Sequence, residues 1–470
     1  MTFRRFLALV ALLAGIAACA SPDQQTPASQ SGPAAVPQLP QQLQREVGPA
    51  YADARLQAYV DGVGRGLVAR SGVGGNYRFV VLDLPVANAH AVGNYIFVTR
   101  GLLALLDDEA ELAAAFGHEL GHLVEGHGAR RARARKGVLD AAVEAAKTTG
   151  SVSVGRSVAR DGLLALRRYS RDQELEADKI GVGMLVRAGY RGSAMGSLID
   201  KLRRQGQFEL QLLGVAPDAI DRRSATATHP APVERRLALE ADPDAARPGE
   251  AGRAPYLAAV DGMIVDDSPQ EGYVRGNRFL HPVMKLAFEA PRDFRLFNEP
   301  DGVLGVGRDG SLMFFSCSDE TVPGSLADWM LNTVKPTPVD VQPTVIGGAE
   351  AAIGARPRGS DAGLGQARYV LVRHGKNVCY FNLLSEGPER DRRIDGLVDA
   401  ARTFHSLTDA EAAALRPHRL RVVSTAGTTA EALAQRLPYA DFKMERLLVL
   451  NGVGTPAELM APPQAKTVQP

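Results

Sequence analysis

The sequence has few of the features that stabilise small secreted domains or mark nucleic-acid binding. It has three Cys in 470 residues, too few for a disulfide scaffold or a Cys-rich zinc array. Its 54 Lys and Arg nearly balance 53 Asp and Glu, and this net charge of +1 gives no sign of a nucleic-acid partner. Apolar residues at 45% and charged residues at 23% are ordinary for a globular chain, which excludes a disordered, collagenous or coiled-coil protein.

Long apolar runs are missing as well, with one exception at the very start. Arg4 and Arg5 precede the apolar stretch Phe6–Ile16, which is too short for a spanning helix of about 20 residues. A positively charged start followed by a short apolar run is typical of an export signal. The sequence therefore predicts a signal peptide over residues 1–18.

The end of this signal resembles a bacterial lipobox, in which small residues precede an acceptor cysteine. The sequence reads IAAC up to Cys19, and Ala20 rather than Asp follows. The resemblance implies a periplasmic protein anchored to the outer membrane by a lipid on Cys19. An ordinary signal peptide with an incidental cysteine is the alternative. Residues 19–44 are rich in Pro, Gln, Ser and Ala and predict a flexible tether behind the anchor.

The two remaining cysteines, Cys317 and Cys379, both lie in strand-like runs. In an oxidising compartment they can pair if their strands are neighbours. Two buried thiols in a sheet are an equally good interpretation.

Composition and periodicity divide the rest of the chain into four segments: residues 45–247, 256–408, 417–455 and 456–470. The first has mostly helical spacing of apolar residues, with strand-like runs at 77–83 and 95–99. The second alternates apolar and polar residues between frequent turns, which indicates a mixed α+β domain without recognisable chemistry. The third is a small folded unit and the last a polar tail. The predicted fold class is α+β.

The strongest chemical signal is the sequence HELGH at residues 118–122. On a helix, His118 and His122 project from one face a turn apart, a spacing that suits two imidazoles on a tetrahedral zinc ion. Glu119 flanks them and can take a proton from the attacking water. With nine His and 53 acidic residues in the chain, roughly 0.02 such matches are expected by chance, so two surface histidines are a poor alternative.

A catalytic zinc takes a third protein ligand and keeps one position open. Glu174 and Asp178 lie four residues apart on a predicted helix. One carboxylate can bind the metal there, and the other can accept the second N–H of a ligating histidine. Glu176 lies on the opposite side and is expected to face solvent. Taken alone such a pair is most often a solvated helix face, but beside HExxH it indicates a metal site.

These motifs together resemble the CAAX-prenyl-protease-like and HtpX-like zinc metalloendopeptidases, and more closely their soluble periplasmic relatives. Four ordered elements within residues 45–245 carry the resemblance: Asn88-Ala89 with YIFVTRGLL, HELGH with His127, YSRDQELEAD, and THPAPVER. It implies a mostly helical gluzincin domain with a small sheet. The roles it implies are zinc ligands at His118, His122 and Glu174, a general base at Glu119, and a carboxylate that supports a ligating histidine at Asp178.

The resemblance also implies an edge strand for substrate, formed by Tyr95, Ile96, Phe97 and Val98. An exposed edge beside a metal site can pair with an extended peptide, and such pairing reads conformation rather than sequence. The resemblance further implies that the His-Pro element brings His229 back to the active site. There the imidazole either donates to the oxyanion or occupies the open metal position, with a turn cap as the alternative. His127 and His90 are interpreted as residues without a ligand role.

A run of cations follows the HELGH helix: Arg130, Arg131, Arg133, Arg135 and Lys136. These side chains either attract an anionic membrane surface or acidic partner, or form a solvated helix end that complements the helix dipole. The second interpretation is the favoured one.

The segment Arg421–Val453 resembles a divergent LysM unit, with a Gly-Thr-Thr turn and a closing Leu-x-x-Leu-Asn. An apparent insertion at Pro438–Met444 leaves two equal interpretations, a peptidoglycan-facing module and a docking or structural unit.

Two functions of different classes fit the sequence. The first is a lipid-anchored periplasmic zinc endopeptidase, whose substrates, by resemblance, are misfolded or misassembled envelope proteins in outer-membrane quality control. The second is a latent or non-catalytic chaperone or assembly scaffold near peptidoglycan and the outer membrane. The complete HExxH and Glu174 set favours the enzyme, because a scaffold has no use for Glu119.

Overall fold

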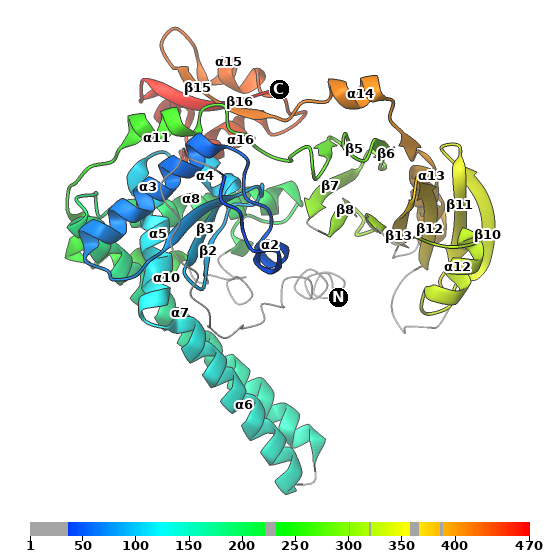
Figure 1. Cartoon of the computed structure of the whole chain (residues 1–470), viewed down its shortest axis with the longest axis horizontal. Helices are drawn as coiled ribbons and strands as arrows, with labels where there is room; N and C mark the ends of the chain where they lie inside the picture. Colours follow the sequence, from blue (N-terminus) through cyan, green and yellow to red (C-terminus); the bar gives the residue numbers. More distant parts are fainter. Residues whose placement is uncertain are drawn as a thin grey trace.

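The structure is a computed structural model, and it describes residues 36–149, 151–220, 232–299, 301–318, 321–357, 366–385 and 389–470. The predicted signal peptide, Cys19 and His229 lie outside these ranges. Helices dominate the N-terminal half and antiparallel sheets the middle, so the predicted mixed α+β class is confirmed (Figure 1). No helix in the described ranges is both long enough and apolar enough to cross a membrane.

The N-terminal part is built on a three-stranded sheet. Strand β1 (Arg78–Leu82) pairs in parallel with β3 (Tyr95–Thr99), and β3 pairs antiparallel with β2 (Ala89–Val92). Helices α3 (Ala54–Ser71) and α5 (Glu109–Val124) share one apolar core with this sheet. Around them lie α2 (Gln41–Val47), α4 (Arg100–Leu105), α8 (Ala194–Leu212), α10 (Pro232–Glu240), the short 3₁₀ helix η1 (Pro243–Ala246) and α11 (Arg253–Val260).

Strand β3 is the central strand of this sheet, so the prediction that residues 95–98 form an exposed edge is wrong. It is paired on both sides, and Ile96, Phe97 and Val98 are fully buried. A continuous apolar run is typical of a strand covered on both faces. Within the described ranges β2 pairs on one side only, and this short strand packs against α5.

Helix α5 packs closely on the long helix α7 (Val152–Arg187) because glycines line the contact. A Cβ added to Gly117 would lie 3.1 Å from the Cα of Gly181. One added to Gly121 would lie 2.8 Å from the carbonyl oxygen of Ala177. Larger residues would push the two helices apart, so these glycines let side chains from both helices reach the same point.

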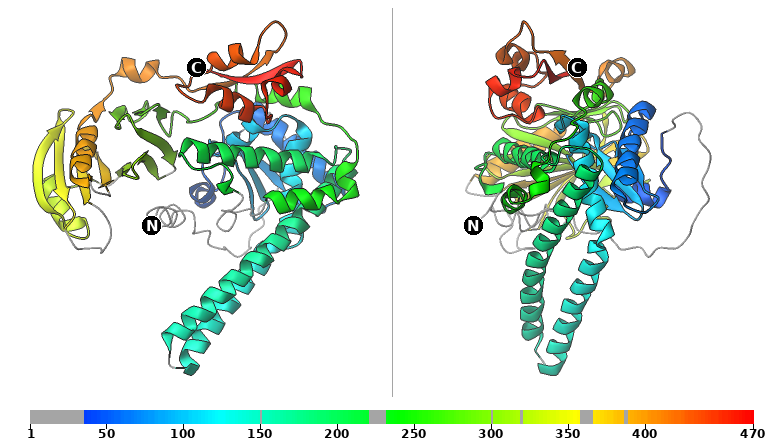
Figure 2. Two further views of the ribbon diagram at one scale, coloured as in Figure 1. Left: turned by 180° about the vertical axis from the view of Figure 1, so that it is seen from behind. Right: turned by 90° about the vertical axis from the view of Figure 1, so that its left-hand side faces the viewer.

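Helix α6 (His127–Thr149) and the first half of α7 form a helical hairpin that projects from the body (Figures 1 and 2). Small residues join the two helices, since Gly155 lies against Ala142 and Ala146. The 23 residues of α6 correspond to a length of about 35 Å. The hairpin therefore projects well beyond the apolar core that α3 and α5 share with the three-stranded sheet.

The middle part carries a seven-stranded antiparallel sheet in the order β10-β11-β12-β13-β9-β8-β7. Its strands are β7 (Phe294–Glu299), β8 (Gly302–Gly307), β9 (Leu312–Ser318), β10 (Val339–Ile346), β11 (Ala349–Ala355), β12 (Gln366–His374) and β13 (Asn377–Ser385). Helix α12 (Leu326–Thr333) covers one face and α13 (Arg390–Arg402) the other, and the adjacent residues Leu371 and Val370 of β12 point into these two cores. A second sheet comprises β4 (Tyr273–Arg275), β5 (Arg278–His281), β6 (Leu286–Glu289) and β14 (His405–Ser406).

Cys317 of β9 lies directly opposite Cys379 of β13, and the two form a disulfide. This decides between the two interpretations that the sequence left open. The bridge closes a loop between residues 62 positions apart. Replacing both cysteines with Ser is therefore expected to lower the free energy of unfolding of the middle part by about 4 kcal/mol. Denaturant unfolding of this variant under oxidising conditions checks the expectation, and an unchanged midpoint would contradict it.

The C-terminal unit joins the core of the N-terminal part. It contains β15 (Arg419–Ser424), α14 (Asp409–Ala414) at its entrance, α15 (Ala430–Gln435), α16 (Lys443–Leu450), α17 (Pro456–Met460) and β16 (Gln464–Gln469). Strand β16 pairs antiparallel with β15, and Leu420, Leu447 and Val468 belong to the same core as α3 and α5. Residues 456–470 are thus a helix and a buried strand rather than the expected polar tail. Their polar composition is misleading because the buried side chain of Lys466 has partners inside the protein.

Candidate metal centre

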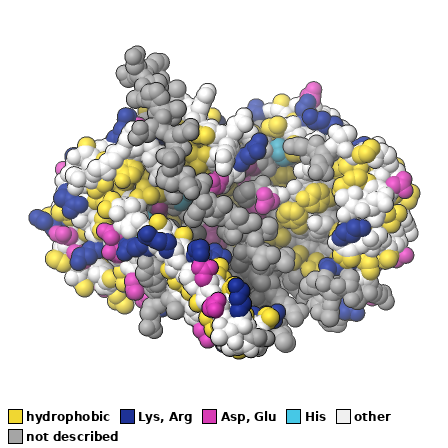
Figure 3. Space-filling model, turned by 60° about the horizontal axis from the view of Figure 1, so that its bottom comes forward, with side chains coloured by type: hydrophobic (Ala, Val, Ile, Leu, Met, Phe, Trp, Pro, Cys, Tyr) yellow, Lys and Arg dark blue, Asp and Glu magenta, His cyan; other side chains and the backbone are white. Residues whose placement is uncertain are grey.

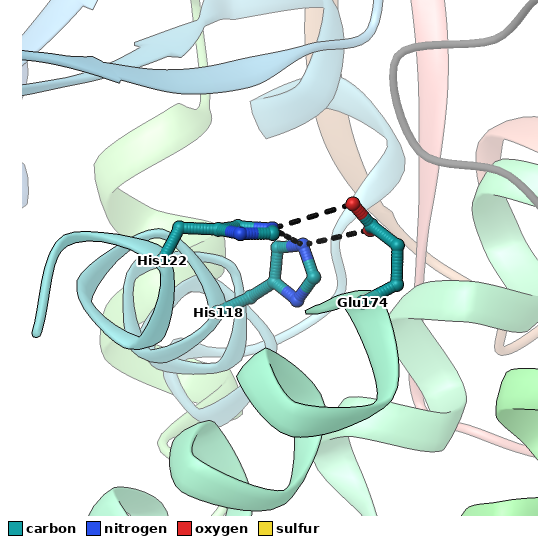
Figure 4. A group of neighbouring side chains, drawn as sticks. All are labelled: His118, His122 and Glu174. Atoms are coloured by element: carbon teal, nitrogen blue, oxygen red, sulfur yellow. Dashed lines mark hydrogen bonds and ion pairs between the residues drawn. The ribbon is translucent and has the colours of Figure 1, made fainter. Parts of the chain in front are cut away.

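Three side chains from two helices converge on one point. His118 and His122 of α5 and Glu174 of α7 point toward one another (Figure 4). The Nε2 atoms of the two histidines are 3.1 Å apart. Carboxylate oxygens of Glu174 lie 3.4 Å from Nε2 of His118 and 3.5 Å from Nε2 of His122. The structure therefore brings together the three residues that the sequence predicts as ligands.

These separations are those that a tetrahedral ion requires. Zinc binds imidazole nitrogen and carboxylate oxygen at about 2.0–2.2 Å, so neighbouring ligand atoms lie about 3.3–3.5 Å apart. Two imidazoles and one carboxylate are also a donor set that suits zinc. The residues present thus fit a single metal ion of this kind.

Asp178 and Arg235 fix the orientation of His118. Nδ1 of His118 lies 2.8 Å from Oδ1 of Asp178, so this nitrogen carries the proton and Nε2 is left for a metal. Arg235 of α10 donates two hydrogen bonds of 2.7 Å to the carboxylate of Asp178. All three side chains are buried. The arrangement confirms that Glu174 and Asp178 share one helix face, while the role of Arg235 was not foreseen from the sequence.

The charges around His118 shift its pKa and that of Asp178. Burial and Arg235 act to lower the pKa of His118, but hydrogen bonds to Asp178 and Glu174 outweigh them and raise it to about 9. A metal ion that binds Nε2 therefore has to displace a proton from this nitrogen. Burial acts to raise the pKa of Asp178, but Arg235 and His118 lower it to about 2. Asp178 is therefore an ionised acceptor at neutral pH, as a carboxylate that holds a ligating histidine must be.

A second chain of contacts orients His122. Its Nδ1 lies 2.7 Å from Nδ1 of His127, and Nε2 of His127 lies 3.0 Å from a carboxylate oxygen of Glu176. Since Glu176 can only accept, His127 donates from Nε2 and accepts at Nδ1 from His122. This leaves Nε2 of His122 for a metal. The polar contact expected for His127 is present, and Glu176 is exposed as expected, where it also pairs with Arg130.

Replacing His127 with Ala removes the acceptor for Nδ1 of His122. We expect metal affinity to fall about 10- to 100-fold, because the ring of His122 loses the contact that fixes its orientation and tautomer. Competition with a fluorescent chelator measures this affinity. His405→Ala, at an exposed position of the middle part, is the control. Equal affinity in both variants would show that His127 does not support the site.

The remaining predicted site residues have different placements. Glu119 is buried on α5 beside His118 and close enough to His122 to act on its charge. Residues 95–98 lie in the central strand and offer no free edge. Among the described residues, β2 (which includes His90) has β3 as its strand partner and packs against α5. His229 lies outside the described residues, and its role stays a prediction.

Residues 54–242 match the family model of peptidase family M48. The chain carries a domain of peptidase family M48. This confirms the resemblance to the HtpX-like metallopeptidases found in the sequence. All three candidate ligands and Glu119 lie within the M48 domain.

Several curated proteins are similar to the chain over this domain. The beta-barrel assembly-enhancing protease of Escherichia coli K12 is 26% identical over 207 residues, 41% of this chain and 40% of that protein. Metalloprotease LoiP of the same organism is 31% identical over 121 residues, 25% of this chain and 48% of that protein. A protease HtpX homolog of Pyrobaculum calidifontis is 45% identical over 78 residues, 16% of this chain and 21% of that protein.

The chain covers only 35% of the length of the putative beta-barrel assembly-enhancing protease of Vibrio cholerae and 40% of that of Escherichia coli O157:H7. The similarity thus concerns the M48 domain.

Proposed function

We propose that the chain is a zinc endopeptidase whose ion is held by His118, His122 and Glu174. The observation that carries this proposal is the convergence of these three side chains at 3.1–3.5 Å beside the buried Glu119. A binding protein would gain nothing from a carboxylate at this position. Membership of the M48 family supports a metal-dependent peptidase, and the donor set supports zinc.

Each residue has a part in peptide hydrolysis. A bound zinc ion supplies a Lewis acid that polarises the scissile carbonyl and makes water more acidic. Glu119 accepts a proton from the attacking water and then delivers it to the leaving amine. Asp178, held by Arg235, keeps the proton of His118 on Nδ1. His127 does the same for His122.

Strand β2 offers the position for substrate. Among the described residues it pairs in the sheet with β3 alone, and it packs against α5, the helix that carries His118 and His122. An extended peptide can add to this edge through main-chain hydrogen bonds, which bind any sequence that is unfolded. Non-native polypeptides are therefore the proposed substrate class. A folded protein cannot present such a strand without opening.

We further propose that these substrates are misfolded or misassembled envelope proteins. The names of the beta-barrel assembly-enhancing proteases support this, as do the export signal and lipobox predicted at Cys19. In this proposal the lipid places the enzyme in the periplasm at the outer membrane. We also propose peptidoglycan as a further contact, on the resemblance of Arg421–Val453 to a divergent LysM unit, with a structural unit as the equal alternative.

The test is cleavage of a reduced, unfolded model protein by the chain before and after metal removal. Cleavage that stops on chelation and returns with stoichiometric zinc is the expected result. If activity returned only with another divalent metal, the proposal that the catalytic ion is zinc would be overturned. Binding of the unfolded protein without any cleavage, with zinc present, would favour the scaffold function instead.

A further inference from the structure

The projecting hairpin, called the arm and comprising residues 127–162, concentrates positive charge. It contains eight Arg or Lys and three Asp or Glu, a net charge of +5. The whole chain has a net charge of +1, so all other residues together sum to −4. Figure 3 shows Lys and Arg side chains along the arm where it comes toward the viewer.

A helix-end role does not explain these cations, contrary to the interpretation favoured from the sequence. Helix α5 ends at Val124, and α6 begins at His127 after Gly126 in the left-handed conformation. Arg130 and Arg131 therefore lie near the start of a new helix, where the dipole disfavours positive charge. Arg130 instead pairs with Glu125 and Glu176, and Arg131 donates to Gln173, so contacts beside the metal site account for these two cations only.

Several of these cations are also available to an external partner. Arg133, Arg135, Lys147 and Arg156 are exposed, and none of them forms an ion pair within the described residues. They occupy both helices of the arm and are spread along its length. A surface charge without an internal partner contributes little to folding, so these side chains are suited to a binding surface.

Exposed apolar side chains accompany the charge toward the far end of the arm. Leu139 is 44% exposed, Val143 54%, Val152 64% and Val154 39%. No Asp or Glu occurs between residues 145 and 160. Val152 and Val154 therefore lie among cations without acidic neighbours, whereas Asp140 and Glu144 directly follow Leu139 and Val143. Apolar side chains among cations are typical of surfaces that enter the headgroup region of a bilayer. A nucleic acid or an acidic protein would use the charge but has no need of exposed Val and Leu.

We propose that the arm binds the surface of a membrane that contains anionic phospholipids. The cations contact the headgroups, and the apolar side chains at the far end enter the interface between headgroups and acyl chains. The arm is a contact separate from any lipid on Cys19. Binding therefore persists in a chain that starts at residue 36, which keeps every described residue.

Co-sedimentation with vesicles tests the proposal. The probe is phosphatidylcholine mixed with phosphatidylglycerol, compared with phosphatidylcholine alone. We expect partition onto the anionic vesicles only, weakening as salt screens the charges. Replacing Arg133, Arg135, Lys147 and Arg156 with Gln is expected to weaken partition at least about tenfold, since each cation near an anionic surface contributes on the order of fivefold. Gln favours helix and keeps the arm folded, which circular dichroism verifies.

A matched variant removes the same charge elsewhere. Arg292, Arg308, Lys376 and Arg436 are exposed, lie outside the arm and have no ion pair among the described residues. Their replacement with Gln should leave partition within about twofold of the parent, because they lie away from the binding surface. Equal losses in both variants, equal binding to neutral vesicles, or no binding by the parent would overturn the proposal. Arm-dependent binding to polyglutamate without binding to vesicles would assign the arm to an acidic protein instead.

Discussion

The Glu119→Gln variant is expected to lose at least about a hundredfold in kcat for cleavage of an unfolded protein while it keeps its metal. The loss follows because an amide cannot accept the proton of the attacking water, and general acid–base catalysis contributes about 10²- to 10⁴-fold. Metal binding persists because the three converging ligand atoms belong to His118, His122 and Glu174. Single-turnover cleavage with metal analysis of the same sample measures both properties.

The control for this variant is Glu125→Gln. Glu125 directly follows α5, and its carboxylate contacts Arg130 rather than the convergent site. Its replacement should leave cleavage unchanged. Full activity in the Glu119→Gln variant would show that Glu119 is not the general base. Loss of metal along with activity would give it a structural role in the site instead.

Replacing Lys466 with Met is expected to lower the free energy of unfolding by about 2–3 kcal/mol, since it leaves buried acceptors without a donor. The Lys466 ammonium is fully buried and donates to the carbonyl oxygens of Ala104, Leu105 and Leu106 at 2.8, 3.0 and 2.7 Å. It also lies 3.0 Å from Oδ1 of Asp107. The side chain thus joins the last strand of the C-terminal unit to the end of α4 in the M48 domain.

Denaturant unfolding compares this variant with Lys376→Met, at an exposed position of the middle part. We expect the Lys466→Met change to destabilise the M48 domain itself, because both parts share one core. Equal effects of the two replacements would show that the C-terminal unit folds independently.

The pH dependence of stability gives a separate check on Lys466. Burial lowers the pKa of its ammonium from 10.5 to about 8, although Asp107 acts in the opposite direction. Between these pH values the unfolded chain keeps the proton and the folded chain releases it. The free energy of unfolding therefore rises with pH in this window. The Lys466→Met variant should lack this contribution, and an identical slope would contradict the assignment.

The metal ligands were predictable because their signal is local. HELGH fixes two imidazoles on one helix face, and Glu174 with Asp178 repeats the four-residue spacing on a second helix. Glycine at 117 and 121 then allows the two helices to meet. No long-range information beyond helix packing is needed to assemble these side chains.

The parts that could not be predicted depend on chain reversals and tertiary pairing. A continuous helix through His122 would turn His127 away from the site, but the helix ends at Val124 and the turn at Gly126 brings the ring back to Nδ1 of His122. The order of strands is also a tertiary property, so a strong strand signal at 95–99 could not show which strand is the edge. Lys466 looked like part of a polar tail because its partners lie about 360 residues earlier in the chain.

The central claim is that His118, His122 and Glu174 hold the catalytic metal. The most direct measurement is the metal content of the purified parent chain and of its Glu174→Gln variant by elemental mass spectrometry after equilibration with limiting zinc. We expect one zinc ion per parent chain and a large loss of zinc in the Glu174→Gln variant, because this variant lacks the one anionic ligand of the three. One zinc ion in both chains, or none in the parent, would contradict it.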